Sequence, residues 1–367
     1  MLASEAGALP FRPEEIRTKG RLGPGKMILV DTVAGTIVHD HEIKAEIAQR
    51  QPYADWVREQ QVHLADLPEV APTRRVEAAD LMQRQTAFGY TTEELQLLIA
   101  PMAVQGQEPV GSMGTDTPLA VLSDRPQLLF KYFRQLFAQV TNPAIDPIRE
   151  QLVMSLITDL GPRGDLLEET PEHARRIRLD QPVLSDADLD RLRAAPEPFQ
   201  SCTLSTLFPV GEGPDGMIAA LERLCGEAAD AVRSGCGVLI LSDRSVDAET
   251  APIPALLAAA AVHHHLIRER LRTGAGLVVE TGEAREVTHF ALLLGYGAEA
   301  VNPYMVWETL GEMVRALSLP AILTGMETAT SPSRTGPATT SPFSSARATE
   351  RSTRAVVSRW AINRTCS

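Results

Sequence analysis

An alternation of short apolar runs with longer helical runs, in residues 237–304, constrains the fold of this 367-residue chain more than its other features do. The apolar runs at residues 238–241 and 277–279 are rich in Val, Ile and Leu, which is typical of strands buried on both faces. The runs that separate them have the length and period of helices. The stretch predicts a β-α-β-α-β series with parallel strands, in an open sheet or in a barrel.

Polar side chains stand where these predicted strands end. Ser242 and Asp243 follow the first strand, Glu280 ends the second, and Asn302 ends the third. The carboxyl ends of parallel strands form the functional side of such sheets and barrels. Asp243, Arg244 and Glu280 therefore stand where a barrel enzyme would hold catalytic groups, although the sequence places no nucleophile or cofactor loop near them.

Charge and hydropathy limit the classes of partner. The net charge of −12 argues against a surface for nucleic acid or anionic membranes. The sequence contains no apolar run of about twenty residues, and its acidic N-terminus is unlike a secretory signal. We therefore expect a soluble, cytoplasmic protein. Its cysteines have neither CxxC nor ferredoxin-type spacing and are expected to be free thiols: Cys202, Cys225, Cys236 and Cys366.

Two short motifs suggest ligand sites but fail on context. GRLGPGK, at residues 20–26, has the spacing of a phosphate-binding loop, but Met27 follows the lysine and a strand is predicted there. A Pro-Gly turn leading into a hairpin is expected instead. His263, His264 and His265 are consecutive, and neighbouring helical residues point about 100° apart, so the three cannot share a metal ion. We expect one or two of them to pack or hydrogen-bond near a helix end.

The rest of the chain contains further predicted elements. The hairpin pairs residues 27–30 with residues 36–38 through a turn at Gly35, and a strand is predicted to end at Phe208. Thr91 or Thr92, and Ser185, have the positions of helix caps. Helices are predicted over residues 40–60, 91–99, 127–140, 185–193 and 217–235. The helix over 40–60 has a possible buried stripe of Ile43, Ile47, Trp56 and Val57. The helix over 127–140 has three aromatic residues that are expected in the core, Phe130, Phe133 and Phe137.

Two long blocks resemble a known family. They are FGYTTEELQLLIAPMAVQGQEPVGSMGTDTPLAVLSDRPQLLFKYFRQLFAQVTNPAIDPIRE, at residues 88–150, and VLILSDRSVDAETAPIPALLAAAAVHHHLIRERLRTGAGLVVETGEAREVTHFALLLGYGAEAVNPY, at residues 238–304. With few gaps the similarity extends from about Arg17 to Trp307. The chain resembles the central domain of the glutamate synthase large subunit, preceded by the end of its glutamine amidotransferase domain. We expect no counterpart in this sequence of the FMN domain that follows in the family.

The resemblance and the residue patterns together define the expected organisation. The fold class is α/β, with parallel β-α units and a barrel-like, TIM-related tendency. Residues 1–50 are expected to be a small β-rich remnant of the amidotransferase domain, residues 51–325 the central domain, and residues 326–367 a disordered or frameshifted tail. The tail is rich in Ser, Thr, Pro and Arg, a composition that cannot bury enough apolar surface to order itself.

The resemblance also implies a function in glutamate biosynthesis and nitrogen assimilation. The intact enzyme converts L-glutamine, 2-oxoglutarate and reductant into two L-glutamates, using FMN and an iron–sulfur cluster. This chain would link the amidotransferase and FMN synthase domains and help wall the ammonia tunnel, with Thr141 and Asn142 as lining candidates. Its partners would be those two domains and a small reductase subunit or ferredoxin. We expect no catalytic, cofactor-binding or metal-binding residue on the chain, and no activity of the chain alone.

Three points stay open in the sequence. The electron donor of the parent enzyme and the oligomeric state are not indicated. The chain could instead be a stand-alone scaffold that docks a separate glutaminase or synthase. A barrel hydrolase or lyase using Asp243 and Glu280 is a weaker alternative, which requires a closed polar pocket at the strand ends.

Overall fold

A computed structural model describes residues 3, 5, 8, 10–70, 78–106, 121–124, 126–133 and 153–315. The chain divides into two compact units, Met1–Glu59 and Gln60–Ser367. The tail predicted over residues 326–367 lies outside the described residues, so its disorder stays a prediction.

The first unit contains the predicted hairpin. β1 (Ile28–Asp31) pairs antiparallel with β2 (Thr36–His39), and the turn between them contains Gly35 at φ +67°. A second turn, with Gly25 also at φ +67°, precedes β1, and the Lys26 side chain donates to Asp40 at 3.1 Å. The GRLGPGK motif is therefore a turn whose lysine is paired with a carboxylate, as its context indicated.

The helical part of this unit is broken and exposed to solvent. It comprises the short η1 (Pro13–Glu15), α1 (Asp40–Ala48) and α2 (Tyr53–Gln60), and Pro52 precedes α2. Among the described residues of Met1–Glu59 none is buried, and Ile47 and Val57 are exposed. The buried stripe predicted over residues 40–60 is wrong for this unit, because one hairpin and single helices provide no second layer to bury it.

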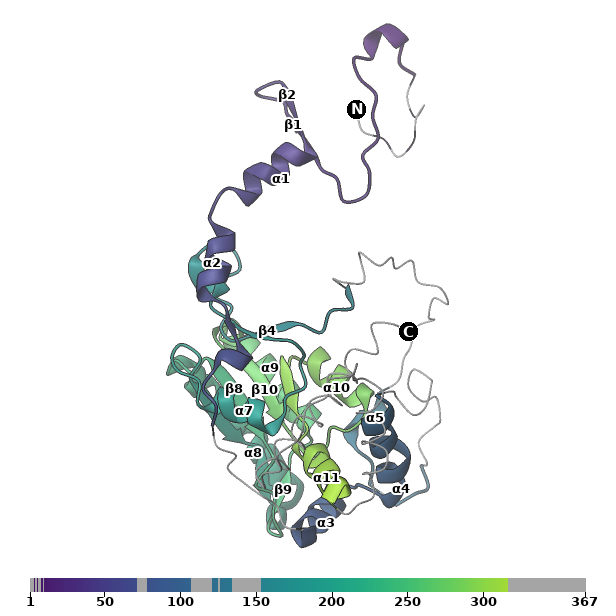
Figure 1. Cartoon of the computed structure of the whole chain (residues 1–367), viewed down its shortest axis with the longest axis vertical. Coiled ribbons are helices and arrows are strands. Elements are labelled where there is room, and N and C mark those ends of the chain that lie inside the picture. Colours follow the sequence, from purple (N-terminus) through teal and green to yellow (C-terminus); the bar gives the residue numbers. More distant parts are fainter. Residues whose placement is uncertain are drawn as a thin grey trace, which may run out of the picture. The chain divides into compact units, whose positions relative to one another are not determined.

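A four-stranded parallel sheet forms the centre of the second unit (Figure 1). Its strands are β6 (Ser201–Ser205), β8 (Val238–Ser242), β10 (Gly276–Glu280) and β11 (Ala300–Asn302), in the spatial order β11-β10-β8-β6. The predicted parallel series is confirmed. Among the described strands this sheet is open, with β6 and β11 at its edges, and no barrel is formed.

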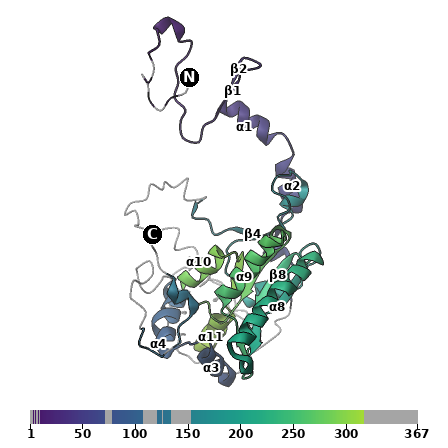
Figure 2. The same ribbon diagram turned by 180° about the vertical axis from the view of Figure 1, so that it is seen from behind.

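The two faces of the sheet have different covers (Figures 1 and 2). Alternate residues of β8 divide between them: Leu239 and Leu241 pack with α8 (Gly213–Arg233) and α9 (Ala255–Arg268). Val238 and Ile240 point the other way, toward α7 (Asp186–Arg193) and residues of a smaller sheet. α10 (Val287–Gly295) packs on Val279 and Val301 in a third cluster together with α9.

Smaller elements complete this side of the unit. The strand predicted to end at Phe208 is divided into β6 and β7, and β7 pairs with β9. The caps predicted at Ser185 and Thr91 are confirmed, since their hydroxyls accept from the backbone N–H of Asp188 and Glu94. The remaining short elements are β3 (Val62–His63), η2 (Leu64–Asp66), β4 (Thr158–Leu160), η5 (Pro171–Ala174), β5 (Ile177–Leu179), β7 (Leu207–Pro209), η6 (Val210–Glu212), β9 (Thr250–Pro252) and η7 (Arg272–Gly274).

Helices from an early part of the chain pack against its last described helix. α3 (Ala78–Ala87), the π-helical η3 (Leu95–Ile99) and α5 (Ala100–Gln105) share a core cluster with α11 (Tyr304–Arg315). The short α4 (Thr92–Glu94) lies between α3 and η3 in the chain. Of the helix predicted over residues 127–140, the described part forms only η4 (Leu129–Tyr132), a 3-10 turn, and Phe133 has extended backbone. The helix prediction is wrong there, because the turn buries Phe130 against the ring of His289. Residues 134–140, with Phe137, lie outside the described part of the chain.

Candidate functional site

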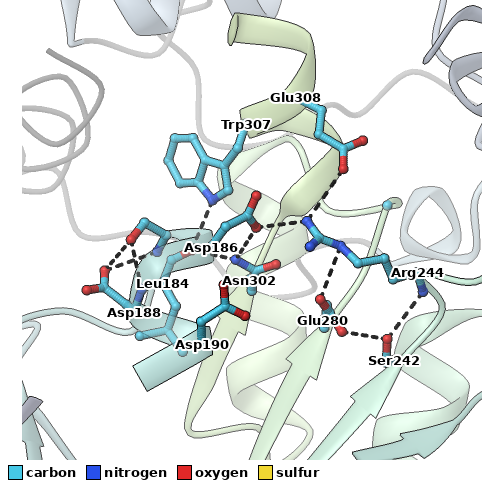
Figure 3. A network of polar contacts seen from close by, with 12 residues as sticks. Leu184, Asp186, Asp188, Asp190, Ser242, Arg244, Glu280, Asn302, Trp307 and Glu308 are labelled. Carbon is cyan, nitrogen blue, oxygen red and sulfur yellow. Dashed lines mark hydrogen bonds and ion pairs between the residues drawn. The ribbon is translucent and has the colours of Figure 1, made fainter. Parts of the chain in front are cut away.

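The side chains predicted to meet at the strand ends do so. In the sheet register Glu280 is opposite Ser242 on one side and Asn302 on the other, and Asp243 continues directly from β8. Figure 3 shows that α7 and α11 bring further charged groups to this edge. The described structure thus gathers the polar residues of three strands and two helices at one place.

Glu280 is the buried centre of this network (Figure 3). Its side chain is inaccessible to solvent, and its Oε2 accepts from Arg193 Nη2 at 2.6 Å and from Ser242 Oγ at 2.5 Å. Its Oε1 lies 3.2 Å from Arg244 Nε, close enough for an ion pair but not aligned for a hydrogen bond. The positive charges of two guanidinium groups therefore offset the free-energy cost of removing this carboxylate from water.

Arg244 connects that carboxylate to both neighbouring helices. Its Nη2 donates to Asp186 of α7 at 2.9 Å and to Glu308 of α11 at 3.5 Å. These three carboxylates keep the pKa of Arg244 above its ordinary value despite the opposing effect of burial. The guanidinium also lies over the ring of Tyr304, 4.7 Å from its centre. Arg244 thus holds β8, α7 and α11 in one arrangement.

Tyr304 also joins the network to α3. Arg84 of α3 lies 5.2 Å from the ring centre and donates to Glu308 at 2.9 Å. Gln85 of α3 donates to Thr309 at 2.9 Å. Residues separated by 224 positions are therefore paired here, which attaches α3 to α11 by charge as well as by apolar packing.

Asp243 is buried beside Glu280 and does not contact solvent freely. Its carboxylate accepts from Thr281 Oγ1 at 2.6 Å and from the Gly282 N–H at 3.0 Å. Burial raises the pKa of Asp243 to about 6, the nearby Glu280 charge adds to this, and the hydrogen bonds oppose it. The raised pKa thus belongs to the carboxylate of a residue of which only 2% is exposed to solvent.

Glu283, in the loop after β10, contacts the first residue of α9. Its Oε2 accepts from the backbone N–H of Ala255, the first residue of that helix, at 3.0 Å. The partial positive charge of a helix N-terminus favours a carboxylate at this position. Burial nevertheless raises the pKa of Glu283 to about 7, and the charge of Asp243 acts in the same direction.

Arg285 fastens the loop after β10 to the segment between α3 and α4; together we call residues 281–285 and 88–94 the clasp. The guanidinium is only 2% exposed; it donates to the carbonyls of Phe88 and Gly89 and to the carboxylate of Glu94. It lies 4.3 Å from the centre of the Tyr90 ring, and the Tyr90 hydroxyl donates to the Gly282 carbonyl. Every one of these contacts crosses from one segment of the clasp to the other.

A small apolar cavity lies beside the clasp. Its volume is about 60 Å³, room for a few water-sized molecules. His289 lies nearby, stacked on Phe130 at 4.3 Å, and burial followed by the Arg285 charge lowers its pKa to about 3. The cavity is lined by Ile99, Met102, Ala103, Val183, Arg285, Phe290, Pro303, Val306, Trp307 and Leu310.

The geometry favours a structural role for the strand-end network over a catalytic one. Asp243 and Glu280 are both buried, and neither lines the cavity. Oε2 of Glu280 accepts from Arg193 and Ser242, and Oε1 is ion-paired with Arg244, so charged and polar protein groups surround this carboxylate. The alternative hydrolase or lyase requires a closed polar pocket at the strand ends, whereas the cavity beside the clasp is mainly apolar and lined by neither carboxylate.

Several residues of the network are not predictable from local sequence. Arg84, Glu94, Arg193, Arg285 and Glu308 acquire their roles through partners far away in the chain. A charged side chain on a predicted helix is usually solvated, so no single-sequence signal separates these from surface charges. The strand-end position, which identified Asp243, Arg244, Glu280 and Asn302, was the useful signal.

Other predicted residues have simpler outcomes. Thr141 and Asn142 lie outside the described residues. His263 accepts from Arg272 Nε at 2.9 Å near the end of α9, as expected for the histidine run, and His264 is exposed. Within the described ranges the structure contains no group of three metal-binding side chains, and no helix there is long and apolar enough to cross a membrane.

The described cysteines do not fit a cluster ligand set. Such a cluster is held by about four thiolates, and the described residues contain no group of three or more side chains able to hold a metal ion. Burial raises the pKa of Cys225 and raises that of Cys236 to about 12. Cys202, Cys225 and Cys236 are free thiols at the core between the sheet and α8.

Comparisons with known proteins agree with the sequence resemblance. The family model of the glutamate synthase central domain matches residues 83–347, and that of class-II glutamine amidotransferases matches residues 1–56. The NADPH glutamate synthase large chain of Bacillus subtilis is 46% identical over 310 residues, which are 84% of this chain and 20% of that protein. The NADH glutamate synthase of Schizosaccharomyces pombe is 44% identical over 325 residues, 85% of this chain and 15% of that protein.

A ferredoxin-dependent relative is equally similar. Ferredoxin-dependent glutamate synthase 1 of Arabidopsis thaliana is 46% identical over 311 residues, 84% of this chain and 19% of that protein. The chain thus spans a fifth or less of the length of these curated relatives. The match of the central-domain model to most of the sequence decides the family: this chain belongs to the glutamate synthase central-domain family.

Proposed function

We propose that this chain is a fragment of the glutamate synthase large subunit and that its central domain links the amidotransferase and synthase domains. In the intact enzyme, glutamine releases its amide nitrogen as ammonia, which condenses with 2-oxoglutarate. A two-electron reduction of the resulting imine then gives glutamate. The single observation that carries the proposal is the similarity of 43–46% identity over 84% of the chain to proteins named as glutamate synthases.

The strand-end network supports a linking role. Buried and part-buried ion pairs connect α3, α7, α11 and the sheet. A domain that must hold two active sites at a fixed separation needs this kind of rigidity rather than its own catalytic groups. We accordingly propose that the chain alone forms no glutamate and that the FMN and the cluster are held elsewhere in the enzyme.

The finer points of the organisation belong to the same proposal. A barrel-like tendency remains part of the proposal: successive strands of this sheet, β6, β8, β10 and β11, are spatial neighbours and α8 and α9 pack on one face, although the described strands form an open sheet. The boundaries at residues 50 and 325 are also proposed, although the central-domain match runs on to residue 347. Thr141 and Asn142 remain proposed tunnel residues, and the cytoplasm the proposed location.

A chimera tests the linking function directly. The segment of the Bacillus subtilis large chain that matches this protein would be replaced by the corresponding residues of this chain. Glutamine-dependent glutamate formation is expected to stay within about tenfold of the parent enzyme, because a linker this similar in sequence should still position both sites. Bound FMN, measured by absorbance, reports whether the chimera has folded.

Two results would count against the proposal. A chimera that binds FMN and hydrolyses glutamine as the parent does, but forms no glutamate from it, would show that this chain does not connect the sites. Glutamate formation by the purified chain alone would show that it has chemistry of its own. Co-purification of the isolated chain with a separately encoded glutaminase or synthase would favour the scaffold alternative.

A further inference from the structure

A second charged cluster lies at the opposite end of the sheet from the strand-end network. It gathers where β10 and β11 begin and where β4 meets β5, and Figures 1 and 2 show β4 at the other end of this unit from α3 and α11. Its centre is Glu299, directly before β11, with a side chain only 5% exposed. Three arginines point at this single carboxylate.

The contacts of Glu299 do not satisfy all three arginines. Oε1 lies 3.0 Å from Arg163 Nη2 and 3.2 Å from Arg272 Nη2. Oε2 lies 3.9 Å from Arg176 Nη2 and has no hydrogen-bond partner. Arg176 donates to the Asp159 carbonyl, but its Nε is buried without an acceptor. A buried unpaired guanidinium N–H is costly, so the cluster is incomplete as it stands.

Neighbouring groups do not remove the excess of positive charge. Asp159 accepts from Gln61 at 3.1 Å, and the other end of that amide accepts from Arg178 at 3.4 Å. Around Arg176 the charged groups are three guanidinium groups and two carboxylates: Arg163, Arg176 and Arg272 with Asp159 and Glu299. This local excess of one positive charge stands in a chain whose net charge is −12.

The arginines differ in how many of their N–H groups already have an acceptor. Arg272 donates to His263, to the carbonyls of Ala275 and Gly297, and to Glu299. Arg163 donates through Nη2 to Glu299, and its side chain is 47% exposed. The free N–H groups are therefore those of Arg163, which reaches solvent, and of Arg176 beside it.

We propose that Arg163 and Arg176 bind a small oxyanion, a phosphate or a carboxylate, at the amino-terminal edge of the sheet. The planar fork of a guanidinium matches two oxygens of such an anion, and two forks facing one carboxylate leave their outer N–H groups for a second. The anion neutralises the excess charge and gives Arg176 an acceptor. Because Arg163 is half exposed, the anion enters from solvent, and its binding fastens the loop after β4 to the starts of β10 and β11.

Anion-dependent stability of the purified chain tests this site. Thermal unfolding is measured in sodium phosphate, sodium acetate and sodium chloride at equal ionic strength, and phosphate affinity by isothermal titration calorimetry. Phosphate stabilises proteins in general by exclusion from their surface, so the comparison between variants decides, not the shift itself. Arg163→Gln should weaken phosphate affinity about tenfold, or about 1.4 kcal/mol, and reduce the rise in Tm accordingly.

The matched control is Arg233→Gln. Arg233 is 50% exposed and is likewise ion-paired, to Asp230 and Glu269, but lies at the end of α8. It should leave anion binding unchanged. Arg176→Gln should abolish anion binding. In chloride this variant should lose less unfolding free energy than removal of a buried charge usually costs, because the substitution also removes the excess positive charge. Preference for acetate over phosphate would identify a carboxylate ligand; equal loss in Arg163→Gln and Arg233→Gln, or no binding by the wild-type chain, would overturn the proposal.

Discussion

Glu280 is the residue at which the positive charges of α7 and of the loop after β8 meet. Replacing it by Gln removes the charge that both Arg193 and Arg244 oppose and leaves two guanidinium groups partly buried. Breaking a buried ion network in this way costs about 3–5 kcal/mol. We expect urea denaturation followed by circular dichroism to show a loss of this size in Glu280→Gln.

An exposed ion pair provides the control for that variant. Asp230 pairs with Arg233 at 3.1 Å, but its side chain is 79% exposed. Because exposed pairs contribute little, Asp230→Asn should leave the unfolding midpoint almost unchanged. A Glu280→Gln variant as stable as Asp230→Asn would mean that the network contributes nothing to the fold, and the linking role proposed for it would lose its basis.

Glu283 gives the folded chain a pH dependence with a definite sign. Its pKa is raised from 4.5 to about 7 in the folded state, so the folded state holds the proton more tightly than the unfolded chain. The stability that this provides is full below pH 4.5 and is lost as the pH rises through 7. In Glu283→Gln, which cannot ionise, we expect the fall in unfolding free energy between pH 5 and pH 8 to become smaller.

Other buried groups make the unfolding free energy rise or fall with pH. The effect of Glu283 is therefore measured as a difference between variants. Asp243, with a pKa raised to about 6, loses stability over a similar range, whereas His289, lowered to about 3, favours the fold as the pH rises toward 6.5. Glu222, exposed on α8, serves as the control. If Glu222→Gln and Glu283→Gln changed the pH profile alike, the buried carboxylate would not be its source.

At the scale of elements, the clasp depends on a glycine. A Cβ on Gly282 would lie 2.6 Å from the Phe88 ring, so an alanine there cannot fit without moving the clasp apart. Overpacking of this kind costs about 1–3 kcal/mol. We expect Gly282→Ala to be destabilised by this amount and to expose amides of residues 88–94 to hydrogen exchange before those of β8.

The control again comes from the same region. A Cβ on Gly295, at the end of α10, would have no neighbouring atom within 4 Å. Gly295→Ala should therefore be neutral or slightly stabilising, because alanine has the higher helix propensity. Should Gly282→Ala prove as stable as Gly295→Ala, with unchanged exchange at residues 88–94, the clasp would not be a close-packed joint.

The elements also show how far sequence reasoning can reach. The runs at residues 238–241 and 277–279 became β8 and β10 because a strand buried on both faces has an unambiguous apolar pattern. The helix predicted around Phe130 failed because helical spacing of aromatics cannot reveal that His289 stacks on one of them. The clasp was equally hidden, since Glu94 and Arg285 are 191 positions apart and leave no local trace of the pair.

At the scale of the whole molecule, the similarity to relatives bears on electron donors. The relatives named for NADPH, NADH and ferredoxin are 46%, 44% and 46% identical to this chain over comparable lengths. A region that selected the donor would be expected to resemble one class more than the others. The proposed linking role agrees with this nearly equal identity, because all three classes must hold two active sites in place.

The first unit provides the last prediction. Leu29 on β1 is 53% exposed, and no described residue of Met1–Glu59 is buried. In the isolated chain Leu29→Lys should hardly change the unfolding free energy, because folding buries little of this side chain. By contrast, Leu239→Ala, at a fully buried position in β8, should cost about 2–5 kcal/mol.

The same substitution should behave differently in the Bacillus subtilis chimera. Residues 1–56 match a class-II amidotransferase, and an isolated two-stranded hairpin is at best marginally stable, so we expect the rest of that domain to cover Leu29 in the larger enzyme. Leu29→Lys should then lower glutaminase activity and thermal stability of the chimera, although it is neutral in the short chain. Equal tolerance in both proteins would mean that the hairpin face stays open to solvent in the intact enzyme, and the assignment of residues 1–50 to the amidotransferase would fail.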